Sequence, residues 1–233
     1  MNVVITGASR GIGKAIAEKF AAEGYNLFLC SRDKKRLSEC VVELKTANIK
    51  NTILFHSADL SNKMEVQEFG KWILQQNSSI DILINNAGHF LPGSIYNEED
   101  GVLEKMIGIN LYSVYHLTRS VLPKMMAQKS GHIFNICSIA ALKAYPNGGS
   151  YSISKHALMG FSKNLREEMK PHNIKVTCVY PGAVFTSSWE ASGVDRERVM
   201  AVNDIAETIY SISKLSPQAC VEDIVLRPQL GDI

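Results

Sequence analysis

The stretch VVITGASRGIG (residues 3–13) decides how this chain folds. Its β-branched first half predicts a buried strand at residues 2–6. Gly7, Gly11 and Gly13 follow, and a helical pattern begins near residue 12. Glycines between a strand and a helix let the backbone approach a phosphate, which the helix N-terminus then holds through its N–H groups and dipole. The stretch predicts a cofactor-binding βα turn, but a glycine-rich turn that only packs could have the same sequence.

The alternation of strand and helix patterns continues along the whole chain. Short β-branched runs predict strands at 2–6, 26–30, 52–56, 81–84, 132–137, 174–179 and 223–227. Stretches with helical period predict helices near 12–23, 34–47, 62–76, 99–107, 110–128, 150–169 and 203–214. This order predicts an α/β fold, a doubly wound parallel sheet of about seven strands with helices on both faces. Without an internal repeat or linker, residues 1–233 are expected to form a single domain.

Composition and charge exclude several classes of protein. Apolar residues make up 45% and charged residues 21% of the chain, which excludes a disordered, collagen-like or disulfide-stapled protein. The net charge of +2 does not indicate a nucleic-acid or membrane-surface partner, and no apolar run is long enough to span a membrane. The five cysteines, odd in number and without CxxC spacing, indicate a reducing compartment. With no leader pattern after Met1, we expect a cytoplasmic protein.

The end of the second strand predicts which dinucleotide binds. An acidic residue at this point would accept a hydrogen bond from the ribose 2′-hydroxyl of NAD. Ser31 and Arg32 stand there instead, and Arg10 lies in the glycine turn. Because arginine binds phosphate in a bidentate manner, this set favours the 2′-phosphate of NADP(H). A simply solvent-exposed basic run at 32–36 is the alternative.

Four polar residues form the candidate catalytic set. Tyr151 and Lys155 lie four apart on a predicted helix and therefore share a face. Ser138 follows the strand at 132–137, and Asn110 begins another predicted helix. Each residue alone has an ordinary explanation: a surface pair, a turn residue or a helix cap.

Together, these motifs resemble the short-chain dehydrogenase/reductase family. TGxxxGxG at 6–13, NNAG at 85–88, Asn110, Ser138, YxxxK at 151–155 and Pro181-Gly182 share its order and spacing across essentially the whole chain. The resemblance implies a Rossmann-like NAD(P)-binding domain with strand order 3-2-1-4-5-6-7. It implies Tyr151 as the acid/base, Lys155 and Ser138 as its partners, and Asn110 as the fourth member. Cys137 departs from the family, many members of which carry a second serine there.

The cofactor contacts expected from the residues and the resemblance follow the same motifs. They are Gly7, Ser9, Arg10, Gly11, Ile12, Gly13, Ser31, Arg32, Asp59, Leu60, Asn86, Ala87, Gly88, Tyr151, Lys155, Pro181, Gly182, Val184 and Thr186.

The chemistry of the four residues fits the reduction of a carbonyl. The cofactor supplies a hydride, and Tyr151 donates a proton to the developing alkoxide. The ammonium of Lys155 is expected to lower the pKa of the Tyr151 phenol, and Lys155 is also expected to reach the ribose hydroxyls. Ser138 is expected to hydrogen-bond the carbonyl oxygen. The resemblance implies that Asn110 holds a water that links Lys155 to solvent.

The substrate depends on a more variable part of the chain. The loop at about 183–202 follows a strand end and is the expected substrate loop. His89 and Phe90 are candidates to face the pocket, and Trp189 could wall it or pack on the surface. The six histidines show no metal-ligand spacing, so no metal site is expected.

Two stretches narrow the reductase further. Residues 181–189 and the tail 221–233 look like those of bacterial sepiapterin reductases, which predicts a small-molecule carbonyl substrate. A 3-oxoacyl-(acyl-carrier-protein) reductase is the alternative, with Lys129 and His172 as a basic docking pair. A non-catalytic NADP(H)-sensing regulator is the alternative of another class. The resemblance also implies a homodimer or homotetramer paired through helices 110–128 and 150–169.

Overall fold

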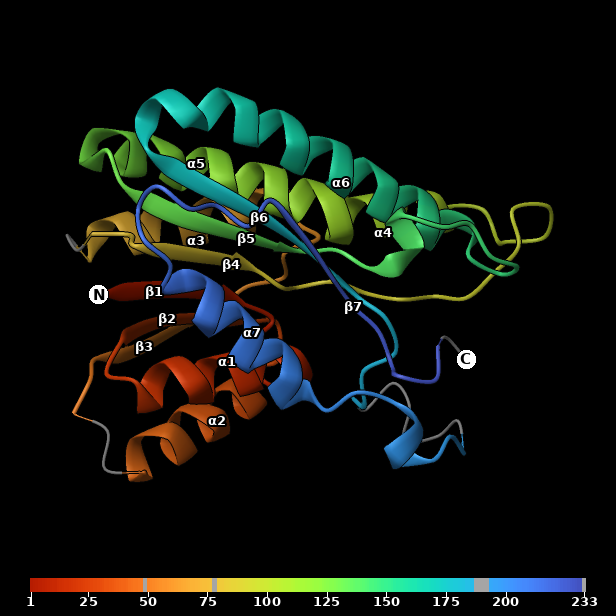
Figure 1. Ribbon diagram of the computed structural model, residues 1–233, viewed down its shortest axis with the longest axis horizontal. Coiled ribbons are helices and arrows are strands. Elements are labelled where there is room, and N and C mark those ends of the chain that lie inside the picture. The colour runs from red at the N-terminus through yellow and green to blue at the C-terminus, as the bar shows by residue number, and fades with distance from the viewer. Residues whose placement is uncertain (48–49, 77–78, 187–192, 232–233) are drawn as a thin grey trace.

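Seven parallel strands form one sheet in the order β3-β2-β1-β4-β5-β6-β7 (Figure 1). The computed structural model describes residues 1–47, 50–76, 79–186 and 193–231. The strands are β1 (Asn2–Thr6), β2 (Asn26–Ser31), β3 (Ile53–Ser57), β4 (Ile82–Asn85), β5 (Gly131–Ile136), β6 (Ile174–Pro181) and β7 (Asp223–Leu226). The helices are α1 (Gly11–Ala22), α2 (Lys34–Thr46), α3 (Lys63–Gln75), α4 (Val102–Ile107), α5 (Ser113–Gln128), α6 (Gly149–Met169) and α7 (Val202–Ser213). The predicted parallel sheet is confirmed.

Helices cover both faces of the sheet, as the chemistry of its strands requires. The residues of β1 are buried, because parallel strands need apolar cover on each side. Helices α1, α2 and α7 pack on one face, and α3, α5 and α6 pack on the other (Figure 1). A Cβ at Gly70 would lie 2.6 Å from Ser120 Cβ, so the glycine lets α3 and α5 approach closely.

The strand order reverses between β1 and β4, which creates a crevice at the carboxyl ends of the strands. In open α/β sheets a crevice of this kind is where ligands bind. Local signals mark the helix ends: the Asp33 side chain caps α2 by accepting a hydrogen bond from Arg36 N at 3.0 Å. The α-helical part of α6 ends at Met169, two residues before Pro171.

Two predicted helix starts differ from the structure. Helix α4 begins at Val102 rather than at 99, because Gly101 has a left-handed φ of +85° and interrupts the helix there. Asn110 does not begin a helix. It lies in a π-helical segment, Gly108–Tyr112, which joins α4 to α5 and in which Ser113 N donates to Gly108 O. Such a segment re-aims its side chains, and that of Asn110 is fully buried.

Candidate active site

The glycine turn after β1 has the geometry of a phosphate cradle. Gly7 and Gly11 have φ values of +66° and +55°, which other residues rarely adopt. A Cβ at Gly13 would overlap Gly7 O and lie 2.5 Å from Asn86 Nδ2. Arg10, at the N-cap of α1, makes no side-chain cap with the helix. The turn therefore provides the space and the helix N-terminus that a dinucleotide phosphate needs.

The end of β2 brings hydroxyl and guanidinium groups toward this turn. Ser9 Oγ and Ser31 Oγ lie 2.8 Å apart. Arg32 is exposed, with its Nη1 3.8 Å from Asp59 Oδ2. Burial works to raise the pKa of Asp59, but hydrogen bonds from Ser61 and the charge of Arg32 bring it below its usual value. These neighbours fit a site for a ribose and its phosphate.

His89 lies on the arginine side of the site. Burial lowers the pKa of its imidazole, and the charges of Arg32 and Arg10 lower it further. Phe90, the next residue, packs edge-on against the Tyr151 ring with centroids 4.8 Å apart. Phe90 therefore contacts the candidate catalytic set through its side chain, whereas His89 hydrogen-bonds Asn110 through its backbone.

The NNAG motif connects β4 to the glycine turn and to the catalytic helix. Thr6 Oγ1 accepts hydrogen bonds from Asn86 N and Ala87 N, both at 3.0 Å. Asn86 Nδ2 donates to Thr6 O at 2.9 Å. A Cβ at Gly88 would lie 3.0 Å from Asn110 Oδ1 and 3.5 Å from Lys155 Nζ. The small residue at position 88 therefore lets Asn110 and Lys155 reach the end of β4.

The Asn110 side chain is committed to hydrogen bonds within the protein. Its Oδ1 accepts from His89 N at 2.8 Å, and its Nδ2 donates to His89 O at 3.0 Å and to Ser154 Oγ at 2.9 Å. Ser154 Oγ in turn donates to Tyr151 O at 2.7 Å. Both amide hydrogens are used, so the side chain anchors α6 to the end of β4.

Ser138 begins a 3-10 helix, Ile139–Ala141, directly after β5. Its Oγ accepts a hydrogen bond from Ala140 N at 3.1 Å. The side chain also interacts with Tyr151, lowering the pKa of the phenol against the effect of burial. Ser138 and Tyr151, thirteen residues apart in sequence, therefore meet at one point.

Lys155 is buried beneath Tyr151. Its Nζ donates to Ile136 O at 3.0 Å and lies 5.8 Å from the centre of the Tyr151 ring. An ammonium has three donors, so two remain for other partners. Burial lowers the pKa of Lys155, because the charged form loses its hydration there.

The expected lowering of the Tyr151 pKa by Lys155 is wrong for the protein alone. Burial dominates and raises the pKa of Tyr151 to about 12. The physical reason is that the phenolate loses hydration, while the ammonium that should stabilise it is desolvated too. At neutral pH Tyr151 is therefore a protonated acid.

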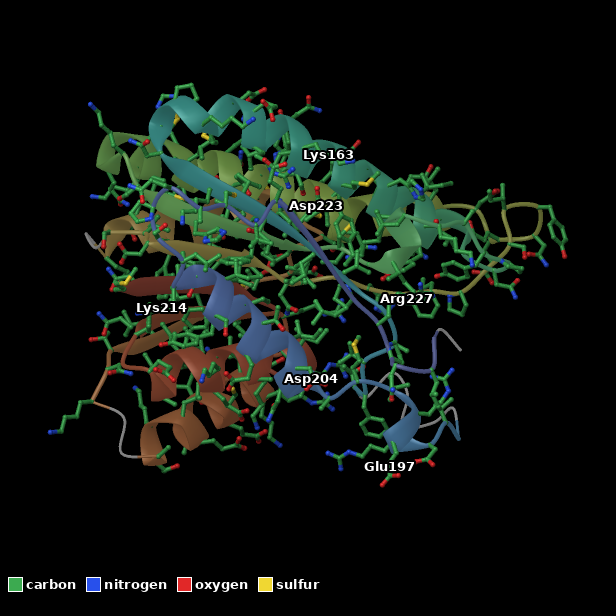
Figure 2. The ribbon with its side chains drawn as sticks, viewed as in Figure 1. Lys163, Glu197, Asp204, Lys214, Asp223 and Arg227 are labelled. Carbon is green, nitrogen blue, oxygen red and sulfur yellow. The ribbon has the colours of Figure 1, made fainter. Side chains whose placement is uncertain are left out.

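The segment after β6 closes over the glycine turn. Gly182 N donates to Leu226 O at 2.7 Å, and a Cβ at Gly11 would lie 3.4 Å from Thr186 Cγ2. Val184 is buried and forms an isolated β-bridge with Met200. The two ends of the segment expected to be the substrate loop therefore lie side by side. Figure 2 labels Glu197, which lies in the short 3-10 helix Arg196–Arg198 before Met200, and Arg227, which directly follows β7. Trp189 lies outside the described residues.

The other predicted cofactor contacts fall into two groups. Ile12 is half-buried at the start of α1, and Pro181 is buried at the end of β6. Leu60 is 5% exposed and belongs to the core cluster under α3, so its side chain packs and only its backbone faces the crevice region.

Three residues at the site have no strong sequence signal. Ser154 lies between Tyr151 and Lys155, and only the tertiary contact with Asn110 reveals it. Tyr145 lies close to Tyr151: burial and that neighbouring phenol raise the pKa of Tyr145 to about 12. Glu98 accepts hydrogen bonds from Ser150, the residue before Tyr151. It comes from a loop with no recognisable motif.

The described part of the chain has neither a cluster of metal-binding side chains nor a helix that could span a membrane. No group of three or more His, Cys, Asp or Glu side chains there could hold a metal ion. None of the helices in the same ranges is long and apolar enough to cross a membrane.

Comparison with known proteins matches this geometry. The family model for short chain dehydrogenase matches residues 1–197. Dehydrogenase/reductase SDR family member 7B of Xenopus laevis is 40% identical over 79% of this chain, and the match spans 58% of that longer protein.

Solved structures resemble the chain over nearly its full length. An alcohol dehydrogenase from the archaeon Thermococcus sibiricus, complexed with 5-hydroxy-NADP, has a TM-score of 0.89 and 28% identity, with 98% of this chain and 96% of that chain covered. A metagenomic short-chain oxidoreductase in complex with NADP has a TM-score of 0.85 and 30% identity, with 98% and 97% covered. The sheet order, the tyrosine and lysine meeting Ser138, and the family match agree: the chain belongs to the short-chain dehydrogenase family.

Proposed function

We propose that the protein is an NADPH-dependent carbonyl reductase that acts on small ketones. The observation that carries the proposal is the half-buried Tyr151 phenol beside Ser138 and Lys155, whose pKa is raised to about 12 by loss of hydration. A protonated acid beside a serine hydroxyl and next to a dinucleotide cradle suits the reductive direction. It can donate a proton at neutral pH without first having to acquire one.

Each residue has a distinct part in this reaction. NADPH, when bound, supplies the hydride that the carbonyl carbon accepts. Ser138, whose Oγ accepts from Ala140 N, turns its hydroxyl hydrogen from Tyr151 to the carbonyl oxygen of the bound substrate and orients it. Tyr151 transfers its proton to the same oxygen as negative charge develops there. Lys155, which uses one donor on Ile136 O, directs its remaining donors toward the ribose hydroxyls.

The choice of cofactor follows from the ends of β1 and β2. Two solved relatives hold NADP or an NADP analogue. The Ser9 and Ser31 hydroxyls, with Arg10 and Arg32 beside them, suit a 2′-phosphate. An aspartate at position 31 would repel that phosphate, and the chain has serine there.

The substrate proposed first is a flat ketone of the sepiapterin type. The resemblance at 181–189 and 221–233 supports it, as do the aromatic neighbours of Tyr151. Phe90 contacts the Tyr151 ring directly, and the Tyr145 phenol lies close to it. The basic pair Lys129 and His172, which an acyl carrier could use, flanks the paired amino ends of β5 and β6. That edge is opposite Ser138, which argues against carrier docking near the site of the same chain.

NADPH oxidation against a panel of carbonyls tests the proposal. The panel contains sepiapterin, small diketones and acetoacetyl thioesters, and Tyr151→Phe is the control for the acid. We expect turnover of the small ketones, and a loss of more than about a hundredfold in Tyr151→Phe with NADPH affinity nearly unchanged. Turnover of the thioesters alone would favour the acyl-carrier reductase. NADPH binding without turnover of any carbonyl would favour the sensing regulator.

A further inference from the structure

Glu98 connects a loop of the substrate side to the helix that carries Tyr151 and Lys155. It lies half-buried in the segment between β4 and α4. Its Oε1 accepts a hydrogen bond from Ser150 N at 2.9 Å, and its Oε2 accepts one from Ser150 Oγ. Both carboxylate oxygens are therefore bound to the residue that directly precedes Tyr151.

The start of α6 depends on this carboxylate. The first N–H groups of a helix have no partner within the helix and need a cap. The N-cap of α6 is Gly148, which offers no side chain for that purpose. Glu98 satisfies the N–H of Ser150 instead, and its negative charge meets the positive end of the helix dipole.

Two glycines make room for the Glu98 side chain. A Cβ at Gly149 would overlap Glu98 Oε1 and Gly93 O. At Gly93, the three atoms nearest to a Cβ all belong to Glu98, with Cγ at 2.7 Å. The loop before α4 and the loop before α6 thus leave a space that only the Glu98 side chain occupies.

Further hydrogen bonds tie the same two loops together. Gly93 N donates to Asn147 O at 3.1 Å, and Ser94 Oγ donates to Asn147 Oδ1 at 2.7 Å. Asn147 holds a left-handed φ of +60° in this arrangement. The two loops run beside each other beyond the carboxyl ends of β4 and β5 (Figure 1).

We propose that Glu98 is a positioning residue that sets Tyr151 relative to the substrate-side loop through Ser150. The inference rests on the proposed function for its kinetic test, and a structural test does not depend on activity. Glu98 contacts Ser150, which directly precedes Tyr151 and lies five residues before Lys155, so its loss should affect carbonyl turnover much more than NADPH binding. Displacement of a reacting group by about 1 Å can cost about a hundredfold in rate.

The kinetic experiment compares Glu98→Ala with its exposed neighbour Glu99→Ala, which removes the same charge. Glu98→Ala should lower kcat/KM for the ketone by about tenfold or more, mostly in kcat, with the NADPH Kd within about twofold. Glu98→Gln keeps a carbonyl oxygen for Ser150 N and should recover most of the loss. Glu99→Ala should match the wild type. Equal losses in Glu98→Ala and Glu99→Ala, or parallel losses in turnover and NADPH binding, would overturn the proposal.

A double-variant cycle uses the glycine. Gly93→Ala should displace Glu98 and reduce kcat/KM about as much as Glu98→Ala does. In the Glu98→Ala background the same change meets no Glu98 side chain and should cost less than about twofold more. Losses that multiply instead would mean that Gly93 and Glu98 act separately, against the proposal.

Hydrogen exchange provides the readout that does not need a substrate. In Glu98→Ala the amide of Ser150 should exchange faster than in the wild type and in Glu99→Ala, while amides of β1 stay protected. Unchanged protection at Ser150 would overturn the proposed cap. If the wild type reduced no ketone but Ser150 lost protection, the proposed function alone would have failed.

Discussion

Ser31→Asp should reverse the cofactor preference of this protein. Ser31 ends β2, and its Oγ lies 2.8 Å from Ser9 Oγ, so the two hydroxyls form one small polar surface beside the glycine turn. A hydrogen bond from this part-exposed surface to a 2′-phosphate, weakened by solvent, is worth about 1 kcal/mol. Arg32 adds a charge contact, but its side chain is 80% exposed, so solvent limits that contact to about 1 kcal/mol at most. The wild type should therefore prefer NADPH over NADH by about thirtyfold in kcat/KM.

The substitution acts on both cofactors. It removes the hydroxyl contact, adds a like charge that costs about 1 kcal/mol beside the phosphate in water, and gives the NADH ribose hydroxyl an acceptor worth about another 1 kcal/mol. Together these effects change the free-energy difference between the two cofactors by about 3 kcal/mol. The Ser31→Asp protein should therefore prefer NADH over NADPH by a few-fold in kcat/KM.

Initial rates with both cofactors, at one ketone concentration and two ionic strengths, measure this change. Ser31→Ala is the matched control: it should lose about fivefold with NADPH and almost nothing with NADH. Added salt should narrow the NADPH preference of the wild type, because Arg32 is exposed. Equal use of the two cofactors by the wild type, or an unchanged NADPH preference in Ser31→Asp, would refute the assignment of Ser31 and Arg32 to the 2′-phosphate.

Three further predictions concern acid–base behaviour and assembly. Because burial raises the pKa of Tyr151 to about 12, kcat/KM for ketone reduction should stay flat from about pH 6 to about pH 9; a fall within that range as the acid ionises would contradict the assigned role. Burial lowers the pKa of His132 to about 3, so below about pH 6.5 the unfolded chain binds a proton at His132 that the folded protein does not bind. The free energy of unfolding should therefore fall by about 1.4 kcal/mol for each pH unit below about 6.5. Urea unfolding should find that slope reduced in His132→Gln, and an unchanged slope would assign it to other groups. We also propose a homodimer or homotetramer paired through α5 and α6, where Tyr115 and Ile153 are 36% and 42% exposed; sedimentation that shows only single chains would exclude it.

Much of the fold could be read from local patterns. The β-branched runs, the glycine turn and Asp33 act over a few residues, so the sequence predicted the strands within one or two residues of their observed bounds. The pattern could not predict the π-helical segment around Asn110. A π turn lacks some of the regular backbone hydrogen bonds of an α-helix. Here the Asn110 side chain makes hydrogen bonds with His89 and Ser154 instead, and these residues lie 21 and 44 positions away in the sequence.

The candidate site likewise has features that the sequence predicted and features that depend on the tertiary structure. Spacing alone placed Tyr151 and Lys155 on one helix face, and the glycines at 7, 11 and 13 predicted a phosphate cradle. Spacing could not give the pKa of Tyr151, because the sequence suggests a nearby ammonium but not how far burial removes water from both groups. Glu98 had no motif, since a carboxylate in a loop becomes a helix cap only when folding brings Ser150 to it, 52 residues along the chain. Local sequence thus determined which chemical groups the site contains, and the tertiary structure decided their hydration, their partners and their orientation.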